Sequence, residues 1–156
     1  MKTILLVNND PSELNGLVEL LRRCRYAVIA PCDGASALAE IASEERIDLV
    51  ITDHQVIGIG ELAILKALRQ TRSDVPAIIL TERGTLDSYL KAISLGMTAY
   101  LENTVGSREV LRAVADALGD SAEEERGSTI AYTRCEAGIL AGRTAYDRGY
   151  AEMVRN

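Results

Sequence analysis

The sequence predicts an α/β fold: a doubly wound, five-stranded parallel sheet followed by a short C-terminal helical tail. Three observations lead to this prediction. Short apolar runs and helical patterns alternate five times before about residue 118. The runs are too uniformly apolar to have one face in water, which is typical of buried parallel strands. Parallel strands also need crossover helices, and these cover both faces of the sheet.

Five apolar runs, rich in aliphatic and β-branched residues, predict the strands. They span residues 2–7, 27–30, 47–52, 75–80 and 98–101. Between them, apolar side chains recur at steps of three and four residues, which predicts a helix after each strand. The five helical stripes are Leu14, Leu17, Val18, Leu21 and Cys24; Leu38, Ile41 and Ala42; Leu62, Leu65 and Leu68; Leu86, Leu90 and Ile93; and Val110, Leu111, Val114 and Leu118.

Polar and small residues mark several of the helix ends. Asp10 is expected to cap the first helix, with Pro11 in its first turn and Glu13 completing a capping box. Gly96 is expected just after the fourth helix, and Ser107 is expected to provide a polar start for the fifth.

The last part of the chain has a different composition. Residues 119–129 hold four acids, two glycines and two serines, as expected of a solvated linker. Beyond it, apolar residues recur every seven positions, which predicts one or two helices that pack on the domain or on a second copy of the chain. These residues are Tyr132, Ile139, Tyr146 and Met153. We therefore expect one domain over residues 1–120, and an acidic linker with a helical tail over residues 121–156.

Composition excludes several classes of protein. The net charge of −6 argues against direct binding to nucleic acid, which needs a basic surface. No apolar run approaches the roughly 18 to 20 residues that cross a bilayer, so we expect no membrane contact and a cytoplasmic location. The three cysteines lie far apart, which predicts neither a disulfide framework nor a zinc site.

Candidate site residues follow the predicted strands, because ligands of doubly wound sheets bind at the carboxyl ends of the strands. No glycine-rich fingerprint follows the first strand, which argues against a dinucleotide site. His54 is the only histidine, which argues against most kinds of catalytic triad and metal cluster. The residues at the strand ends are Asn8, Asn9, Asp10, Asp53, Thr81, Glu82 and Asn103.

Four segments, ILLVNND, DLVITD, AIILTERG and GMTAYLEN, resemble the receiver domain of bacterial response regulators. The resemblance covers residues 1 to about 120 and implies a flavodoxin-like (βα)5 receiver fold. It also implies that Asp53 is the phosphoacceptor and that the Thr81 hydroxyl hydrogen-bonds the phosphoryl group. Tyr100 matches the aromatic residue that moves with this hydroxyl and reports the switch.

The sequence departs from the family at its charged positions. Receivers usually carry two acids after the first strand and a lysine after the fifth, but the matching residues here are Asn8, Asn9 and Asn103. The acids normally hold Mg²⁺ together with the phosphoacceptor, and the ligands that remain by resemblance are Asn9, Asp53 and Gln55. Amides carry no charge, and Mg²⁺ favours carboxylates. We expect its affinity to be weak, lower by roughly ten- to a thousand-fold, or absent.

The loop after the fourth strand departs as well. Glu82 stands where a small residue is expected, and Arg83 follows it. Glu82 could restore a metal ligand and Arg83 a countercharge, although both are also typical of charges on a solvated loop.

Three functions are compatible with these residues. The resemblance implies a two-component signal transduction receiver that accepts a phosphoryl group on Asp53 from a histidine kinase or phosphotransfer protein and switches a protein-interaction surface. The alternative is an atypical pseudo-receiver, a phosphorylation-independent interaction or dimerisation module. The third is a small flavodoxin-like cofactor binder or enzyme, which no phosphate-cradling loop supports. We favour the first: a response regulator that is not an enzyme and acts on a downstream protein, with homodimerisation as a further candidate interaction.

Overall fold

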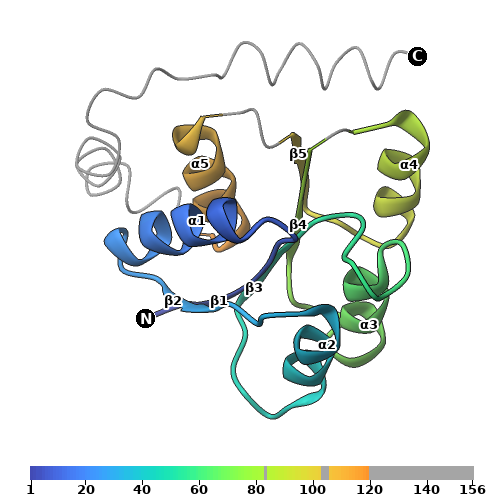
Figure 1. Ribbon diagram of the computed structural model, residues 1–156, viewed down its shortest axis with the longest axis horizontal. Coiled ribbons are helices and arrows are strands. Elements are labelled where there is room, and N and C mark those ends of the chain that lie inside the picture. Colours follow the sequence, from blue (N-terminus) through green and yellow to red (C-terminus); the bar gives the residue numbers. More distant parts are fainter. Residues whose placement is uncertain (83, 103–105, 120–156) are drawn as a thin grey trace.

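Five strands and five helices alternate along the part of the chain that the structure describes, which is residues 1–82, 84–102 and 106–119 of a computed structural model. The strands form one parallel sheet in the order β2-β1-β3-β4-β5 (Figure 1). They are β1 (Thr3–Val7), β2 (Ala27–Ile29), β3 (Leu49–Thr52), β4 (Ala77–Thr81) and β5 (Ala99–Glu102). The helices are α1 (Pro11–Arg23), α2 (Gly34–Ala42), α3 (Ala63–Thr71), α4 (Leu86–Ser94) and α5 (Ser107–Ala117). The predicted α/β fold is confirmed.

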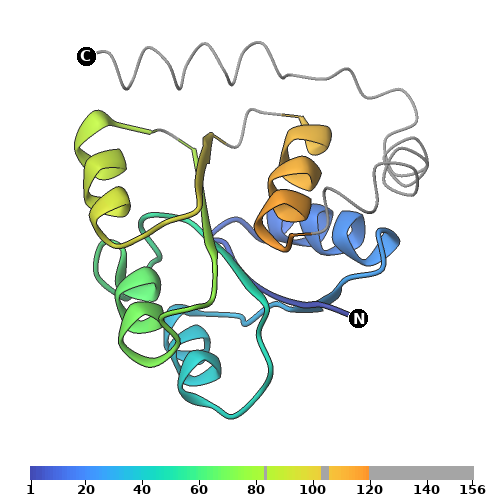
Figure 2. The same cartoon turned by 180° about the vertical axis from the view of Figure 1, so that it is seen from behind.

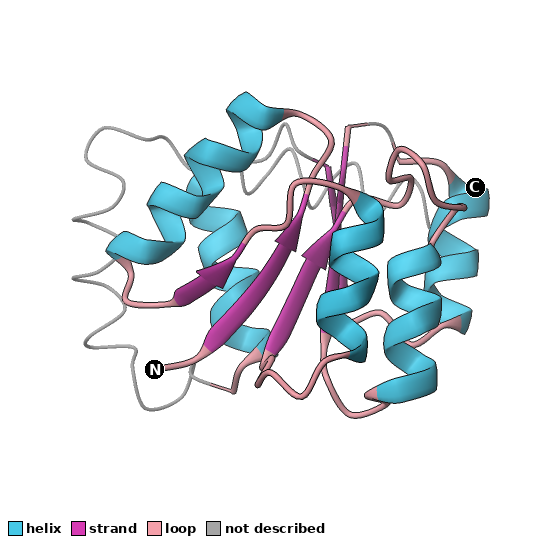
Figure 3. Cartoon of the chain, turned by 60° about the horizontal axis from the view of Figure 1, so that its bottom comes forward, coloured by secondary structure: helices cyan, strands magenta, loops and turns pink. Residues whose placement is uncertain are grey.

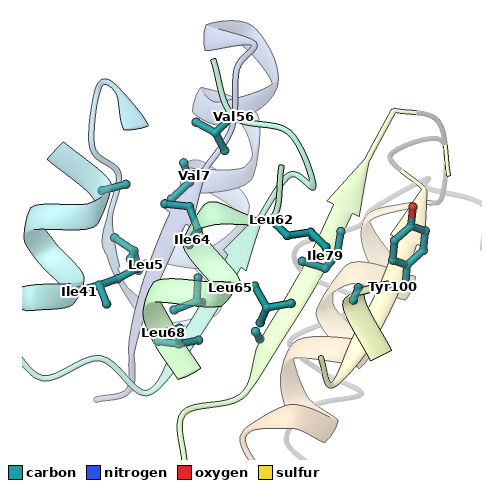
Figure 4. Packing of buried hydrophobic residues seen from close by; sticks show 14 of the residues in the cluster. Leu5, Val7, Ile41, Val56, Leu62, Ile64, Leu65, Leu68, Ile79 and Tyr100 are labelled. Atoms are coloured by element: carbon teal, nitrogen blue, oxygen red, sulfur yellow. The ribbon is translucent and has the colours of Figure 1, made fainter. Parts of the chain in front are cut away.

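Helices cover both faces of the sheet. In Figure 1, α1 and α5 lie on one face and α2, α3 and α4 on the other, and Figure 2 shows the same arrangement from behind. Each face has its own apolar core, because successive residues of a strand point to opposite sides. In β1, Ile4 and Leu6 belong to the core under α1 and α5. Leu5 and Val7 belong to the other core, shown in Figure 4.

Whether a strand is central or at the edge of the sheet explains how far it is buried. The central strands β1, β3 and β4 are buried along nearly their whole length, as the uniformly apolar runs predict. Figure 3 shows the strands between helices on both sides. The expectation of a fully buried strand is wrong for β2. Its three residues are only half-buried, because β2 lies at the edge of the sheet and pairs with β1 alone.

The expectation of a buried apolar stripe on α4 is also wrong. Leu90 and Ile93 are 54% and 47% exposed, whereas the buried residues of α4 are Ser88, Tyr89 and Ala92. The buried face contains a serine because its hydroxyl has partners inside the protein, described below. A search for apolar residues alone could not place a polar residue on that face.

The predicted cap of α1 and the glycine after α4 are confirmed, the capping box expected from Glu13 stays a prediction, and the start of α5 differs. Asp10 caps α1 and accepts hydrogen bonds from the backbone N–H groups of Ser12 at 2.9 Å and Glu13 at 3.4 Å. Gly96 follows the last residues of α4 with a φ of 74°, a left-handed conformation that glycine adopts without strain. Ser107 is the first residue within α5, and the cap is Gly106, which offers no side chain for hydrogen bonding.

The register of the sheet aligns the ends of three strands. Val7 pairs with Thr52 across β1 and β3, and Thr52 pairs with Ile79, two residues before the end of β4. Asp53 therefore emerges near the ends of β1 and β4, at the same edge of the sheet. The predicted domain boundary stays a prediction, because the linker and tail at residues 121–156 lie outside the described residues. None of the described helices is long and apolar enough to span a membrane.

Candidate functional site

A cavity of about 410 Å³ lies where β1, β3 and β4 end. The order of strands reverses beside β1, since β2 lies on one side of it and β3 on the other, and ligands of such sheets bind next to this point. Five of the predicted site residues line the cavity together with His54. The lining residues are Asn9, Asp53, His54, Gln55, Thr81 and Glu82.

Asp53 directly follows β3, and its side chain is 16% exposed. Its backbone N–H donates to the carbonyl of Val7 at 3.3 Å, which ties the residue to the end of β1. One carboxylate oxygen contacts His54 at 3.1 Å and receives a long hydrogen bond of 3.5 Å from the Gln55 N–H. The carboxylate is thus held at the cavity and remains within reach of a ligand.

His54 joins the two groups to which the sequence assigns chemistry. Its Nδ1 lies 3.1 Å from Asp53 Oδ1 and 2.7 Å from Thr81 Oγ1. According to the tautomer of the ring, Nδ1 can donate to the Asp53 carboxylate or accept from the Thr81 hydroxyl. The sequence alone did not predict His54 as a residue of the site. Its position in the sequence, directly after Asp53 at the end of a strand, could have identified it as a site residue.

Thr81 is the last residue of β4 and is 1% exposed. Its hydroxyl faces the cavity and meets His54, so a residue that belongs to the sheet also contributes to the site. Glu82 follows it and is exposed at the rim.

The two amides after β1 have different roles. Asn9 reaches the loop after β3, where its Nδ2 donates to the Gln55 carbonyl at 2.6 Å and its Oδ1 accepts from the Ile57 N–H at 2.9 Å. Asn8 does not line the cavity. Its Oδ1 accepts from the backbone N–H of Asp10 at 2.8 Å, which makes a local turn before α1.

Tyr100 lies in β5 and does not line the cavity either. It is 1% exposed and belongs to the apolar core shown in Figure 4. Its hydroxyl is 2.6 Å from the hydroxyl of Ser88 in α4. Its ring meets Tyr89 edge-on, with the ring centroids 5.6 Å apart. Burial raises the pKa of Tyr100, a shift that the hydrogen bonds from Ser88 and the Thr85 backbone partly oppose. Tyr100 pairs with Ile79, two residues before Thr81, so all three lie on one face of the sheet.

The predicted ligands do not fit a magnesium ion in this arrangement. Both polar atoms of the Asn9 side chain are hydrogen-bonded, and the Gln55 carbonyl is one of their partners. Among the described residues, no three side chains of histidine, cysteine, aspartate or glutamate form a group that could hold a metal. Arg83 and Asn103, the other residues considered for the charge of the site, lie outside the described residues.

Comparison with known proteins agrees with this fold. A family model described as the response regulator receiver domain matches residues 4–115. Among curated relatives, the transcriptional regulatory protein CpxR of Escherichia coli is 34% identical over 114 residues, which is 73% of this chain and 48% of CpxR. PrrA of Mycobacterium tuberculosis, also a transcriptional regulatory protein, is 29% identical over 126 residues, 81% of this chain and 52% of PrrA. The chain spans about half the length of these relatives.

Solved receiver structures share the fold. A signal receiver domain of an HD domain-containing protein from Pseudomonas fluorescens superposes with a TM-score of 0.70 and 28% identity, covering 79% of this chain and 98% of that one. A CheY-like receiver domain protein from Methanospirillum hungatei gives a TM-score of 0.72 at 22% identity, covering 80% and 98%. Because the family model matches residues 4–115, which is most of the chain, the chain belongs to the response regulator receiver domain family.

Proposed function

We propose that this chain is a two-component receiver that accepts a phosphoryl group on Asp53 from a histidine kinase or phosphotransfer protein and then switches a protein-interaction surface. The observation that carries the proposal is the placement of the Asp53 carboxylate. The carboxylate lies at the cavity, and a single residue, His54, contacts both it and the Thr81 hydroxyl. The nucleophile and a donor for the transferred group therefore share one site.

In the proposed reaction, an Asp53 oxygen attacks the phosphorus in line with the leaving group. The P–N bond of a phosphohistidine breaks, and its electron pair returns to the histidine nitrogen while the new P–O bond forms. The transferred group is stabilised by donors already pointing at it. In this chain those donors are the Thr81 hydroxyl and the backbone N–H groups beside Asp53, with His54 moving aside or donating to the same oxygens.

The path from the site to a partner surface begins at Thr81. If its hydroxyl moves toward a phosphoryl group, it vacates space on the face of the sheet that it shares with Tyr100. Tyr100 is hydrogen-bonded to Ser88, so a change in its position bears directly on α4. We infer that α4 and β5 carry the signal to a downstream protein or to a second copy of the chain.

A second function is favoured by the charges of the site. Asn8 and Asn9 supply no carboxylate for a cation, and His54 already fills hydrogen-bonding positions on both Asp53 and Thr81. These features suit a pseudo-receiver, in which Mg²⁺ binds weakly or not at all and a partner is bound without phosphorylation. In either function we expect a cytoplasmic protein that acts through protein contacts, without direct binding to nucleic acid or membrane.

Treatment with acetyl phosphate tests the choice between the two. The full chain is incubated with acetyl phosphate and millimolar magnesium chloride and followed by intact-protein mass spectrometry. We expect the mass of one phosphoryl group to be added to the wild type and not to the Asp53→Asn variant. Asp74→Asn is the matched control, because this aspartate is exposed in the loop before β4, away from the site, and it should behave as the wild type. A wild type that gains no mass would favour the pseudo-receiver.

A further inference from the structure

We propose that the Asn9 carboxamide takes the place of a magnesium ion as the link between the loop after β1 and the loop after β3, so that the site is assembled without a cation. Receiver domains typically bind Mg²⁺ at the phosphorylation site. The inference concerns how this site is built and does not depend on whether Asp53 is phosphorylated.

The link consists of two hydrogen bonds from one side chain. Asn9 Nδ2 donates to the Gln55 carbonyl at 2.6 Å, and Asn9 Oδ1 accepts from the Ile57 N–H at 2.9 Å. The partners are backbone groups of fixed character, since a carbonyl only accepts and an N–H only donates. They therefore determine which way the amide faces. The side chain binds the loop at two points that lie 46 and 48 residues away in the sequence.

These bonds compete with a cation for the same oxygens. Mg²⁺ demands near-octahedral oxygen ligands at about 2.0–2.1 Å. The Gln55 carbonyl and Asn9 Oδ1 each accept a hydrogen bond, so a cation would have to share these oxygens with their donors or displace the donors. In return it would gain only neutral oxygens, beside the single carboxylate of Asp53 and the exposed Glu82. The amide, in contrast, links the loops without any charge that needs balancing.

A carboxylate at position 9 should reverse this behaviour. The side chain of an Asn9→Asp variant can still accept from the Ile57 N–H, but it cannot donate to the Gln55 carbonyl. Two oxygens then face each other at the former 2.6 Å contact and repel unless a cation lies between them. The variant is therefore expected to depend on Mg²⁺ for a link that the wild type makes by itself.

An exposed asparagine on α1 offers a matched control. Asn15→Asp makes the same chemical change at a side chain that is exposed and does not line the cavity. Asn9→Ala is the second comparison, because it removes the link without creating repulsion. Its stability should fall, and Mg²⁺ should not restore it.

The experiment measures urea unfolding of the full chain by circular dichroism, in EDTA and in millimolar magnesium chloride. We expect the unfolding midpoints of the wild type and of Asn15→Asp to be the same with Mg²⁺ as with EDTA. The unfolding equilibrium constant of Asn9→Asp should be about ten-fold higher than that of the wild type in EDTA and should recover with Mg²⁺. In parallel, NMR titration of the wild type with Mg²⁺ should leave the amide signals of Gln55 and Ile57 in place, and the same titration of Asn9→Asp should shift them.

Three results would overturn the proposal: saturable shifts of Gln55 and Ile57 in the wild type, stabilisation of the wild type by Mg²⁺, or an Asn9→Asp variant as stable as the wild type in EDTA. If Asn9→Asp does not fold in either buffer, the wild-type titration decides alone. None of these measurements involves phosphate, so their failure is distinct from a failure to phosphorylate Asp53.

Discussion

His54 is the residue with the most direct influence on the two groups of the proposed phosphoacceptor site. Its Nδ1 lies between the Asp53 carboxylate and the Thr81 hydroxyl, at 3.1 Å and 2.7 Å. A phosphoryl group on Asp53 that bonds to Thr81 must span the same two groups. In the proposed reaction, we therefore expect the ring of His54 to move away from Thr81 as the phosphorylated site forms.

Removing this ring is predicted to speed modification of Asp53. Breaking a hydrogen bond to a partly exposed group costs about 1 kcal/mol, which corresponds to roughly five-fold in rate if the wild type breaks it on the way to the transition state. We expect His54→Ala to react with acetyl phosphate a few-fold faster than the wild type, as measured from initial rates by intact-protein mass spectrometry.

Lys66→Ala serves as the control for this prediction, because Lys66 is exposed on α3 and should leave the rate unchanged. A slower His54→Ala variant would contradict the prediction and would show that the Nδ1–H group helps to hold the incoming phosphoryl group.

Residues of the site differ in how well the sequence predicts them. Asp53, Thr81 and Asn9 could be placed in advance, because parallel strands bring their carboxyl ends to one edge. The bridging position of His54 could not, since it depends on a rotamer that turns the ring back toward Thr81. The local hydrogen bond of Asn8 with the Asp10 N–H also depends on backbone geometry, which its residue type does not reveal.

At the scale of elements, α4 is joined to the sheet by a polar contact. The Ser88 hydroxyl lies 2.6 Å from the hydroxyl of Tyr100 and also takes part in the capping box with Thr85 at the start of the helix. The position of α4 is therefore coupled to the residue that we propose as the reporter of the switch. This contact also explains why the buried face of α4 departs from the apolar stripe.

A double-mutant cycle should detect this coupling. Ser88→Ala and Tyr100→Phe are each expected to lower the free energy of unfolding, and the double variant should lose about 1 kcal/mol less than the sum, because both single changes remove the same hydrogen bond. Urea unfolding of the four proteins gives the coupling energy. A coupling energy near zero would mean that the two hydroxyls do not stabilise each other.

The stability of the protein at alkaline pH gives a second test of the environment of Tyr100. Burial raises the pKa of Tyr100 above the value of about 10 that it has in the unfolded chain. The folded state then binds the proton more tightly, so this contribution to stability is complete below pH 10 and is lost as pH rises through the folded-state pKa. The unfolding free energy of the wild type should fall more steeply above pH 10 than that of Tyr100→Phe.

Some contacts between elements have no pattern in the sequence. The Arg69 guanidinium at the end of α3 donates to four backbone carbonyls, two in the loop before β4 and two at the end of α4, and so holds together the edge of the sheet opposite the site. These acceptors are Ser73, Val75, Leu95 and Gly96. From the sequence, a single arginine on a helix is expected to be a charge in solvent. Its contacts could not be predicted, because the four carbonyls come together only in the folded chain.

The sequence predicts the overall fold better than it predicts the contacts of single residues. Five apolar runs separated by five helical patterns leave few arrangements, because parallel crossovers are right-handed and helices must cover both faces. The β2-β1-β3-β4-β5 order agrees with that expectation. The pattern does not fix how deeply each strand is buried, since β2 becomes an edge only once the order of the strands is known.

The two cores lead to a prediction about the length of chain that folds. The buried apolar residues that the structure describes all lie between Ile4 and Ala115, and helices cover both faces of the central strands. We therefore expect a chain ending at residue 120 to fold and to retain the unfolding free energy of the full chain within about 0.5 kcal/mol, as is usual for changes away from the core. Urea unfolding and superposition of amide NMR spectra of the two chains measure this.

A shorter truncation tests whether the limit is set by the core. Ending the chain at residue 102 deletes α5 and takes Val110, Leu111 and Val114 out of the core under α1. Large apolar residues lost from a core cost about 2–5 kcal/mol each, so this fragment should lose cooperative unfolding altogether. The contrast matters more than either truncation alone. If the chain ending at residue 120 also unfolded without cooperativity, residues 121–156 would have to be part of the folded domain, and the predicted division into a receiver domain and a separate tail would be wrong.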